Sequence, residues 1–482
     1  MEPQVFATVV LGAGITCCFL PSRCSLWAML CFSVFWGSSA VTLPSLGGSS
    51  VSPASFFLPF YFGRLLLLPG SVEALFEELT PRRPIFWFLI LTIWVIISAL
   101  FFPRFFEREM MVFSLTRYSD NPEMVVLRPA SGNLSQMVYA VGGFATAWAT
   151  CVYCRMPGGY RAAFQAILAM AIVNIVGGVL DLATTLTGTE FLMDAFRSGT
   201  YTLHNDAEVA NIKRLVGWMP EASIFSYFSL QILATTFTFY LARINPLITG
   251  TLSLILVLMI AASTSTAGYF GLAVFSLAFG LYAVWSFFQH RLRPIAIFSL
   301  TALMGIVGGL LLFMFVPKFG DLAERIFLEI VVKKSTSASA LERGSWNSTA
   351  WNVFLETGGL GAGIGSTRGS SYVLVLLSNV GVIGFVLFAW MIWRTMSISF
   401  PAASIPRERA VIWGGRAAVG MTLIVGAALW NVYDLGTSFY CLLGLCMSVD
   451  PLRSVVPAIA TRKQTVLQKS IALGTPNPAE SA

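Results

Sequence analysis

Long apolar runs dominate this chain, and mostly short polar stretches separate them. A bilayer-spanning helix needs roughly 17 or more apolar residues. Runs of about that length lie at about 4–20, 26–43, 55–68, 84–102, 134–154, 162–185, 221–242, 246–262, 267–288, 295–316, 372–393, 410–430 and 434–449. The run at 55–68 is the weakest, because it is short and contains Arg64. The pattern predicts an all-α, polytopic transmembrane helix bundle with about 12 to 13 spans.

Composition supports a membrane location. Of the 482 residues, 56% are hydrophobic and 11% are charged, whereas soluble domains are about 45–50% apolar and about 25% charged. A single transmembrane domain over residues 1–450 leaves no room for a separate soluble domain. The net charge of +7 fits basic cytoplasmic loops, so we expect the lipid bilayer as a partner and no nucleic acid.

Short basic loops predict the orientation of the bundle. The loops "CRMPGGYR", "LARIN", "HRLRP" and "WRTMSISFPAASIPRER" fall on one side when the spans are threaded in order, and short Lys- and Arg-rich loops stay in the cytoplasm. We expect the tail at 451–482 on that side too, partly disordered because it is small, polar and proline-containing. The opposite, extracytoplasmic side then receives three long loops, at about 103–133, 186–220 and 317–371.

The extracytoplasmic loops are expected to carry some structure of their own. In the first, "MMVFSL" and "EMVVLRP" flank "TRYSDNP", which predicts two short strands around a turn. In the third, "RIFLEIVV" and "TAWNVFLE" predict short amphipathic helices near the membrane interface. A simple linker would need neither.

The glycine run in the third loop leaves two alternatives open. "ETGGLGAGIGSTRGSS" matches neither dinucleotide-binding nor P-loop spacing. Gly363 and Gly365, followed by Arg368 and Ser370, could form an anion-binding turn at the mouth of a helix. The other reading is a tight loop that re-enters the membrane.

Three segments resemble the bacterial O-antigen ligase and polymerase superfamily, over about residues 120–395. "ERGSWNSTAWNVFLETGGLGAGIGSTRGSSYVLVLLSNVGVIGFVLF" is similar to its signature loop, with an Arg, a Trp three residues on, a Gly-x-Gly-x-Gly run and a helix. "KRLVGWMPEASIFSYFSLQIL" is similar to the family's Arg-x-x-Gly passage. "LRPASGNLSQMVYA" is similar to a passage of exopolysaccharide members.

The resemblance implies a membrane glycosyltransferase of the bacterial inner membrane, with no metal and no cofactor. Its donor would be an undecaprenyl-diphosphate-linked oligosaccharide, used at the outer face, with a chain-length regulator as a possible protein partner. Arg214, Arg343 and Arg368 would neutralise the departing diphosphate. The base that activates the acceptor stays open among His204, Glu221, Glu342 and Glu356. Further substrate contacts are expected from Trp346, Lys213, Gly363, Gly365, Ser370 and Asp181.

One departure from the family favours a polymerase of glycan repeat units. Lipid-A-core ligases of the superfamily carry a His just after the glycine run, where this chain has Ser370 and Ser371. An O-antigen ligase is therefore the first alternative. A polysaccharide transporter or flippase is the second, because no inverted repeat is evident and the polar residues concentrate in the loops rather than at mid-membrane.

Overall fold

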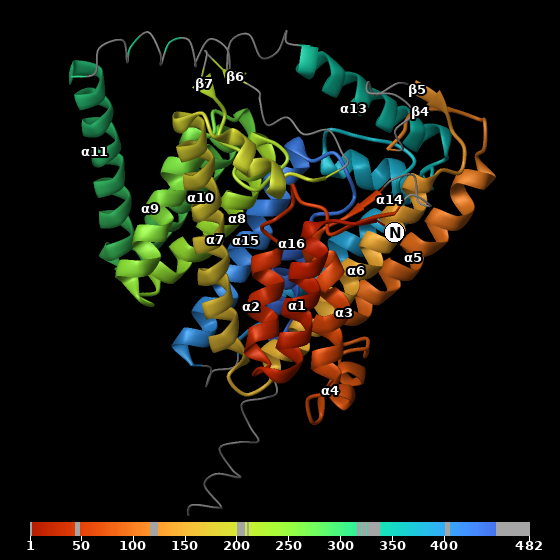
Figure 1. Ribbon diagram of the computed structural model, residues 1–482, viewed down its shortest axis with the longest axis horizontal. Helices are drawn as coiled ribbons and strands as arrows, with labels where there is room; N and C mark the ends of the chain where they lie inside the picture. The colour runs from red at the N-terminus through yellow and green to blue at the C-terminus, as the bar shows by residue number, and fades with distance from the viewer. Residues whose placement is uncertain are drawn as a thin grey trace, which may run out of the picture.

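The computed structural model is mostly helical (Figure 1). It describes residues 2–43, 49–115, 124–199, 208–209, 212–315, 320, 324, 338–400 and 405–449. The helices are α1 (Val5–Phe19), α2 (Arg23–Phe32), α3 (Pro53–Leu66), α4 (Ser71–Glu77), α5 (Pro84–Phe105), α6 (Ser131–Arg155), α7 (Gly159–Thr187), the 3₁₀ helix η2 (Glu190–Phe196), α8 (Ala222–Leu241), α9 (Pro246–Ala262), α10 (Thr266–Phe288), α11 (Leu292–Phe315), α13 (Ala338–Glu356), α14 (Tyr372–Ser397), α15 (Pro406–Leu429) and α16 (Thr437–Met447).

Short antiparallel strands form three small sheets. The N-terminal sheet contains β1 (Glu2–Pro3), β2 (Val41–Leu43) and β3 (Ser49–Val51). A second pairs β4 (Met111–Phe113) with β5 (Met124–Val126), which confirms the two strands expected in the first long loop. The third pairs β6 (Glu208–Val209) with β7 (Ile212–Lys213) and was not expected.

The expectation of a multi-pass membrane protein is supported. In the described part of the chain, seven helices are long and apolar enough to span a membrane, namely α5, α6, α7, α8, α10, α14 and α15. The expected 12 to 13 spans exceed this number. Five further apolar stretches occupy expected spans but are shorter where side chains are described, at Phe6–Phe19, Arg23–Phe32, Pro246–Ala262, Leu292–Gly308 within α11, and Thr437–Met447.

Two expected spans are interrupted, for identifiable reasons. The run at 26–43 is helical only as far as Phe32, because the backbone at Gly37 bonds to another loop: its N–H donates to Trp218 O and its carbonyl accepts from Gly199 N. The run at 55–68 is continued by α4 after a bend of 108°. Gly70 allows the bend, since its φ of +72° suits the left-handed region.

The core depends on small residues and internal hydrogen bonds. Between α6 and α16, a Cβ on Gly444 would lie 2.3 Å from Ala147 O, so only glycine permits this approach. Gln231 of α8 donates to Thr422 of α15 at 3.1 Å and accepts from Ser438 of α16 at 2.7 Å. Such bonds join helices where lipid offers polar groups no partner.

The long loops gather at one end of the bundle, which we call the loop end. Figure 1 shows β4–β5, β6–β7 and α13 at this end, and α4 at the opposite end. Helix α13 includes "TAWNVFLE", so that expected helix is confirmed. The other expected helix, "RIFLEIVV", lies outside the described residues.

Candidate functional site

The loop end brings two of the three predicted arginines together. Arg214 directly follows β7, and Arg343 lies on α13. Burial lowers the pKa of Arg214, the carboxylate of Glu221 opposes this effect, and the charge of Arg343 lowers the pKa further. Tyr269 of α10 belongs to the same group of interacting side chains. Two positive charges that act on each other at a partly buried place favour a ligand with negative charge.

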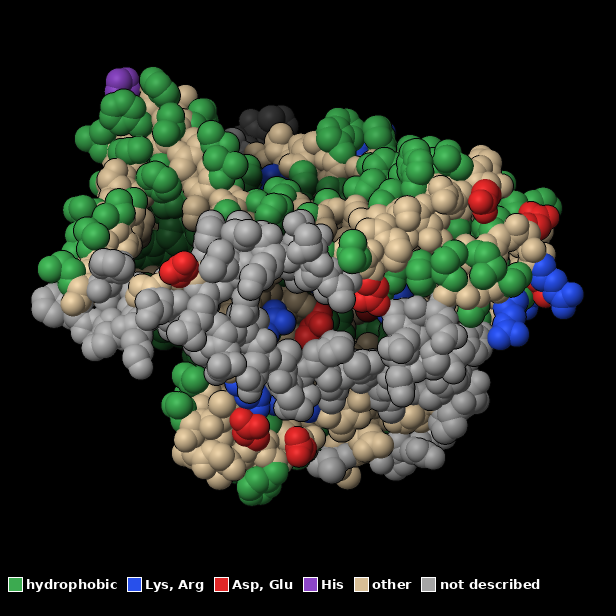
Figure 2. Space-filling view, turned by 90° about the horizontal axis from the view of Figure 1, so that it is seen from above, with side chains coloured by type: hydrophobic (Ala, Val, Ile, Leu, Met, Phe, Trp, Pro, Cys, Tyr) green, Lys and Arg blue, Asp and Glu red, His purple; other side chains and the backbone are tan. Residues whose placement is uncertain are grey.

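Figure 2 looks onto this end of the molecule and shows basic and acidic side chains inside a hollow near its middle. Two buried donors at the site have no hydrogen-bond partner among the described residues: Nε of Arg214 and Nε1 of Trp346. Trp346 is only 9% exposed. A buried donor without a partner costs about 1–3 kcal/mol, so both groups are suited to bind an acceptor such as a phosphate oxygen.

Trp346 also joins Arg343 to Arg368. Arg343 and Trp346 are three residues apart on α13 and therefore share a face. The guanidinium carbon of Arg368 lies 5.7 Å from the centre of the Trp346 ring, and Arg368 Nε donates to Ser114 O at 3.2 Å. Ser370, which is buried, donates its backbone N–H to Asn347 Oδ1 at 2.7 Å. The segment around Arg368 is thereby fastened to α13.

The glycine run fills a break in α14. Gly381 has a non-helical backbone inside this helix, with φ 69° and ψ −172°. The N–H of Val382 donates to Gly359 O, and the N–H groups of Ala362 and Gly363 donate to carbonyls of Ser378 and Asn379, all within 2.9 Å. A helix can be broken inside a membrane where other protein groups take over its freed hydrogen bonds.

Two asparagines hold the rest of this loop. Asn133, near the start of α6, donates to Ile364 O at 2.7 Å and to Ser366 Oγ at 3.0 Å. Asn379 accepts from the N–H of Ser366 at 3.2 Å and donates to Thr367 O at 3.0 Å. Neither asparagine was among the predicted site residues, although an asparagine next to apolar helical sequence is a signal of an internal polar contact.

The structure favours the tight-loop alternative for Gly363 and Gly365. A Cβ on Gly363 would lie 2.6 Å from Ser98 O, and one on Gly365 would lie 2.4 Å from Gly132 O. The N–H of Gly363 is used within the fold by Asn379 O. These glycines therefore serve close packing, and their expected contact with substrate stays a prediction.

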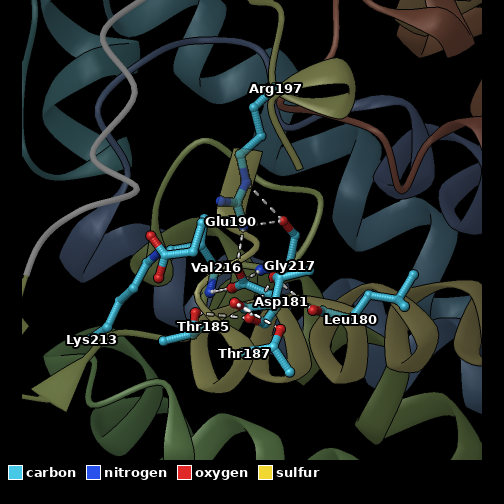
Figure 3. Close-up of polar contacts among 10 residues, drawn as sticks. Leu180, Asp181, Thr185, Thr187, Glu190, Arg197, Lys213, Val216 and Gly217 are labelled. Carbon is cyan, nitrogen blue, oxygen red and sulfur yellow. Dashed lines mark hydrogen bonds and ion pairs between the residues drawn. The ribbon is translucent and has the colours of Figure 1, made fainter. Parts of the chain in front are cut away.

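Asp181 ties together the segment that follows Arg214 (Figure 3). Its Oδ2 accepts from the N–H groups of Val216 at 2.7 Å and Gly217 at 2.9 Å, and its Oδ1 accepts from Arg197. Arg197 also donates to Gly217 O. Both carboxylate oxygens of Asp181 are thus occupied, so its geometry is that of a scaffold residue, and the expected substrate contact stays a prediction. Arg197 was missed as a site residue.

The remaining predicted site residues are not all at the site, and each has different surroundings. Lys213 pairs with Glu190 at 2.8 Å, and this hydrogen bond is the main cause of a lowered pKa of Glu190. Glu221 precedes α8 and accepts a hydrogen bond from Ser223 Oγ. Glu342 and Glu356 are exposed on α13. His204 lies outside the described residues.

Among the described residues, no group of three or more His, Cys, Asp and Glu side chains is placed to hold a metal ion. The groups available for a ligand are guanidinium, indole, hydroxyl and carboxylate groups, which suit an anion with attached hydroxyls. In comparisons with protein-family models, curated proteins and solved structures, the chain matches none of them.

Proposed function

We propose that this chain is a membrane glycosyltransferase that polymerises undecaprenyl-diphosphate-linked glycan repeat units for an O-antigen or exopolysaccharide. The observation that carries the proposal is the electrostatic interaction of Arg214 with Arg343, which come from distant parts of the sequence. Beside them lie the unpartnered donors Arg214 Nε and Trp346 Nε1. A diphosphate has the charge and the acceptor oxygens to satisfy both features.

The chemistry follows from the charge that develops as the sugar leaves its carrier. Breaking the bond between the anomeric carbon and the diphosphate oxygen places negative charge on the diphosphate. Preorganised cations stabilise that charge more strongly in a partly water-excluded site than in bulk water. Arg214 and Arg343 would hold the diphosphate, and Arg368 beside Trp346 would extend the cationic surface toward the glycan. We propose that this reaction takes place at the outer face of the bacterial inner membrane.

The test uses purified protein in detergent with an undecaprenyl-diphosphate-linked oligosaccharide as both donor and acceptor. We expect chain elongation by the wild type, and a rate at least about 100-fold lower for Arg214→Gln and for Arg343→Gln. The matched control is Arg291→Gln, which removes the same charge at an exposed position between α10 and α11. Elongation by both site variants at the wild-type rate would remove the proposal.

The acceptor separates a polymerase from an O-antigen ligase, since both would use the same donor. Products that grow on the lipid carrier support the polymerase. Transfer only to an added lipid A-core acceptor would support the ligase instead. Gel separation of the products distinguishes the two.

A transporter is the second candidate, and the break in α14 favours it. Discontinuous helices line substrate sites in many transporters, and α14 is interrupted at Gly381. In this chain the break is filled by the loop at 359–363, which favours the enzyme. Movement of lipid-linked glycan across vesicles without elongation would support the transporter.

A further inference from the structure

Asp434 lies in the connection from α15 to α16 and forms a second polar centre. Its Oδ1 accepts from Gly436 N at 3.1 Å, and Tyr440 forms a side-chain hydrogen bond with the same carboxylate. Trp430 Nε1 donates to the backbone carbonyl of Asp434 at 3.0 Å. The neighbours Tyr433 and Leu435 are buried, but part of Asp434 remains accessible. Figure 1 shows this connection at the loop end.

Tyrosines from four helices interact with this carboxylate, although the hydroxyls of Tyr139, Tyr227 and Tyr372 donate to backbone carbonyls. The tyrosines that interact with it electrostatically are Tyr139 of α6, Tyr227 of α8, Tyr372 of α14 and Tyr440 of α16, together with the adjacent Tyr433. Asp434 is therefore near the point where α6, α8, α14 and α16 converge. The rings of Tyr227 and Trp430 stack with their centres 4.4 Å apart.

Asp434 differs from other enclosed carboxylates because, among the residues that the structure describes, it has no cation as a partner. Asp181 is paired with Arg197, and Glu78 is paired with Arg155. No such ion pair forms at Asp434 within the described ranges, where its hydrogen bonds come from Gly436 and Tyr440. An enclosed carboxylate without a cation is costly and usually has a functional reason.

Hydrogen bonds join this connection and the end of α15 to the residues that follow Arg368. Tyr372 donates its hydroxyl to Tyr433 O at 3.1 Å, and Ser371 donates to Ala427 O at 2.6 Å. Both donors immediately follow the segment that carries Arg368. On the other side, Trp36 packs on Trp430 with ring centres 5.6 Å apart, and the next residue, Gly37, bonds to Trp218 of the Arg214 segment.

Building on the proposed function, we propose that Asp434 is the catalytic base that binds the acceptor hydroxyl and takes its proton. In this step the acceptor O–H bond breaks and its proton moves to the Asp434 carboxylate. The acceptor oxygen forms a bond to the anomeric carbon of the donor. The bond from that carbon to the diphosphate breaks, and the diphosphate leaves with the electron pair.

Asp434 suits this role better than Glu221. Both carboxylates accept hydrogen bonds, but Glu221 faces the positive charge of Arg214, whereas no such charge acts on Asp434 among the described residues. At Asp434, burial raises the pKa to about 6, and the hydrogen bonds from Gly436 and Tyr440 offset part of that increase. A base is most effective when its pKa lies near the working pH.

The experiment measures the elongation rate of the purified protein against pH, with the undecaprenyl-diphosphate-linked oligosaccharide described above. For the wild type we expect the rate to rise with pH through a midpoint near the pKa of about 6 of Asp434. Asp434→Asn should lower the rate by about 100-fold or more and abolish this dependence. Tyr440→Phe removes a hydrogen bond that lowers the pKa, so it should move the midpoint to higher pH.

The matched control is Tyr160→Phe on α7, because this hydroxyl donates to the backbone carbonyl of Ser448 and Tyr160 is not among the groups that act on Asp434; we expect an unchanged midpoint. Gel filtration reports whether each variant folds. If Asp434→Asn does not fold, the pH midpoint of Tyr440→Phe tests the role of Asp434 instead. The role of Asp434 would be overturned if Asp434→Asn kept the wild-type rate and pH profile while Arg343→Gln was inactive. It would also be overturned if the midpoint of Tyr440→Phe were unshifted while Arg343→Gln was inactive. Failure of the wild type to elongate rejects the proposed function itself.

Discussion

Arg197 donates a hydrogen bond to Asp181 at 2.5 Å, and both side chains are almost completely buried, at 2% and 3% exposure. The same carboxylate holds the N–H groups of Val216 and Gly217. The pair therefore joins α7 to the segment that follows Arg214. Its removal should disturb both the stability of the loop end and the position of Arg214.

Asp181→Asn should lower the free energy of unfolding by about 3–5 kcal/mol, because it leaves the charge of Arg197 buried without a partner. The measurement is a denaturant titration in detergent micelles. Glu190→Gln is the matched control, since the Glu190 side chain is 43% exposed and such pairs contribute about 1 kcal/mol or less. Equal effects of the two substitutions would contradict a special role for the buried pair.

Two glycines with positive φ should respond differently to alanine. Gly363→Ala would place a Cβ 2.6 Å from Pro103 Cδ and Ser98 O, whereas Gly358 has open space around it. We expect Gly358→Ala to cost about 1–2 kcal/mol of unfolding free energy, from backbone strain alone. Gly363→Ala adds about 1–3 kcal/mol of overpacking. The same denaturant titration applies, and a larger effect at Gly358 would show that the loop does not pack against α5.

Stability should fall as the pH rises through the titration of Asp434. The pKa of this carboxyl is raised from 3.8 to about 6 by burial. Between these values the folded protein holds a proton that the unfolded chain has released, so the free energy of unfolding decreases with increasing pH. The total loss by pH 7 is about 3 kcal/mol. Subtracting the profile of Asp434→Asn isolates this contribution, and two profiles of identical slope would refute it.

The proposed orientation places the loop end outside the cell. In a background where Cys18, Cys24 and Cys31 are serine, a membrane-impermeant maleimide should label Ser345→Cys on α13 in intact cells. It should label Thr80→Cys, which follows α4 at the opposite end, only after the cells are opened. Both positions are exposed. The reverse pattern would place the arginines in the cytosol and exclude the proposed donor.

Sequence patterns predicted the parts of the fold that depend on local interactions. A long apolar run must satisfy its own backbone hydrogen bonds in lipid, so α5, α7 and α8 follow closely from composition. The strands β4 and β5 and helix α13 also follow from short local patterns. The expected 12 to 13 spans exceed the seven helices of the described residues that are long and apolar enough to cross a membrane, because apolar length alone does not distinguish a spanning helix from a shorter buried one. The interruptions at Phe32 and after Leu66 depend on a distant partner for Gly37 and on one turn at Gly70.

Residue types by themselves determined that this chain is a multi-pass membrane protein whose polar residues are concentrated in three loops. Only the tertiary structure decided which of those residues meet. Arg214 and Arg343 interact because the Asp181–Arg197 pair and α13 bring distant segments to one place. For the same reason, Gly363 and Gly365 pack closely against other parts of the fold, and tyrosines from several helices lie around Asp434. Each outcome depends on contacts between residues far apart in the chain, and local sequence patterns carry no information about such contacts.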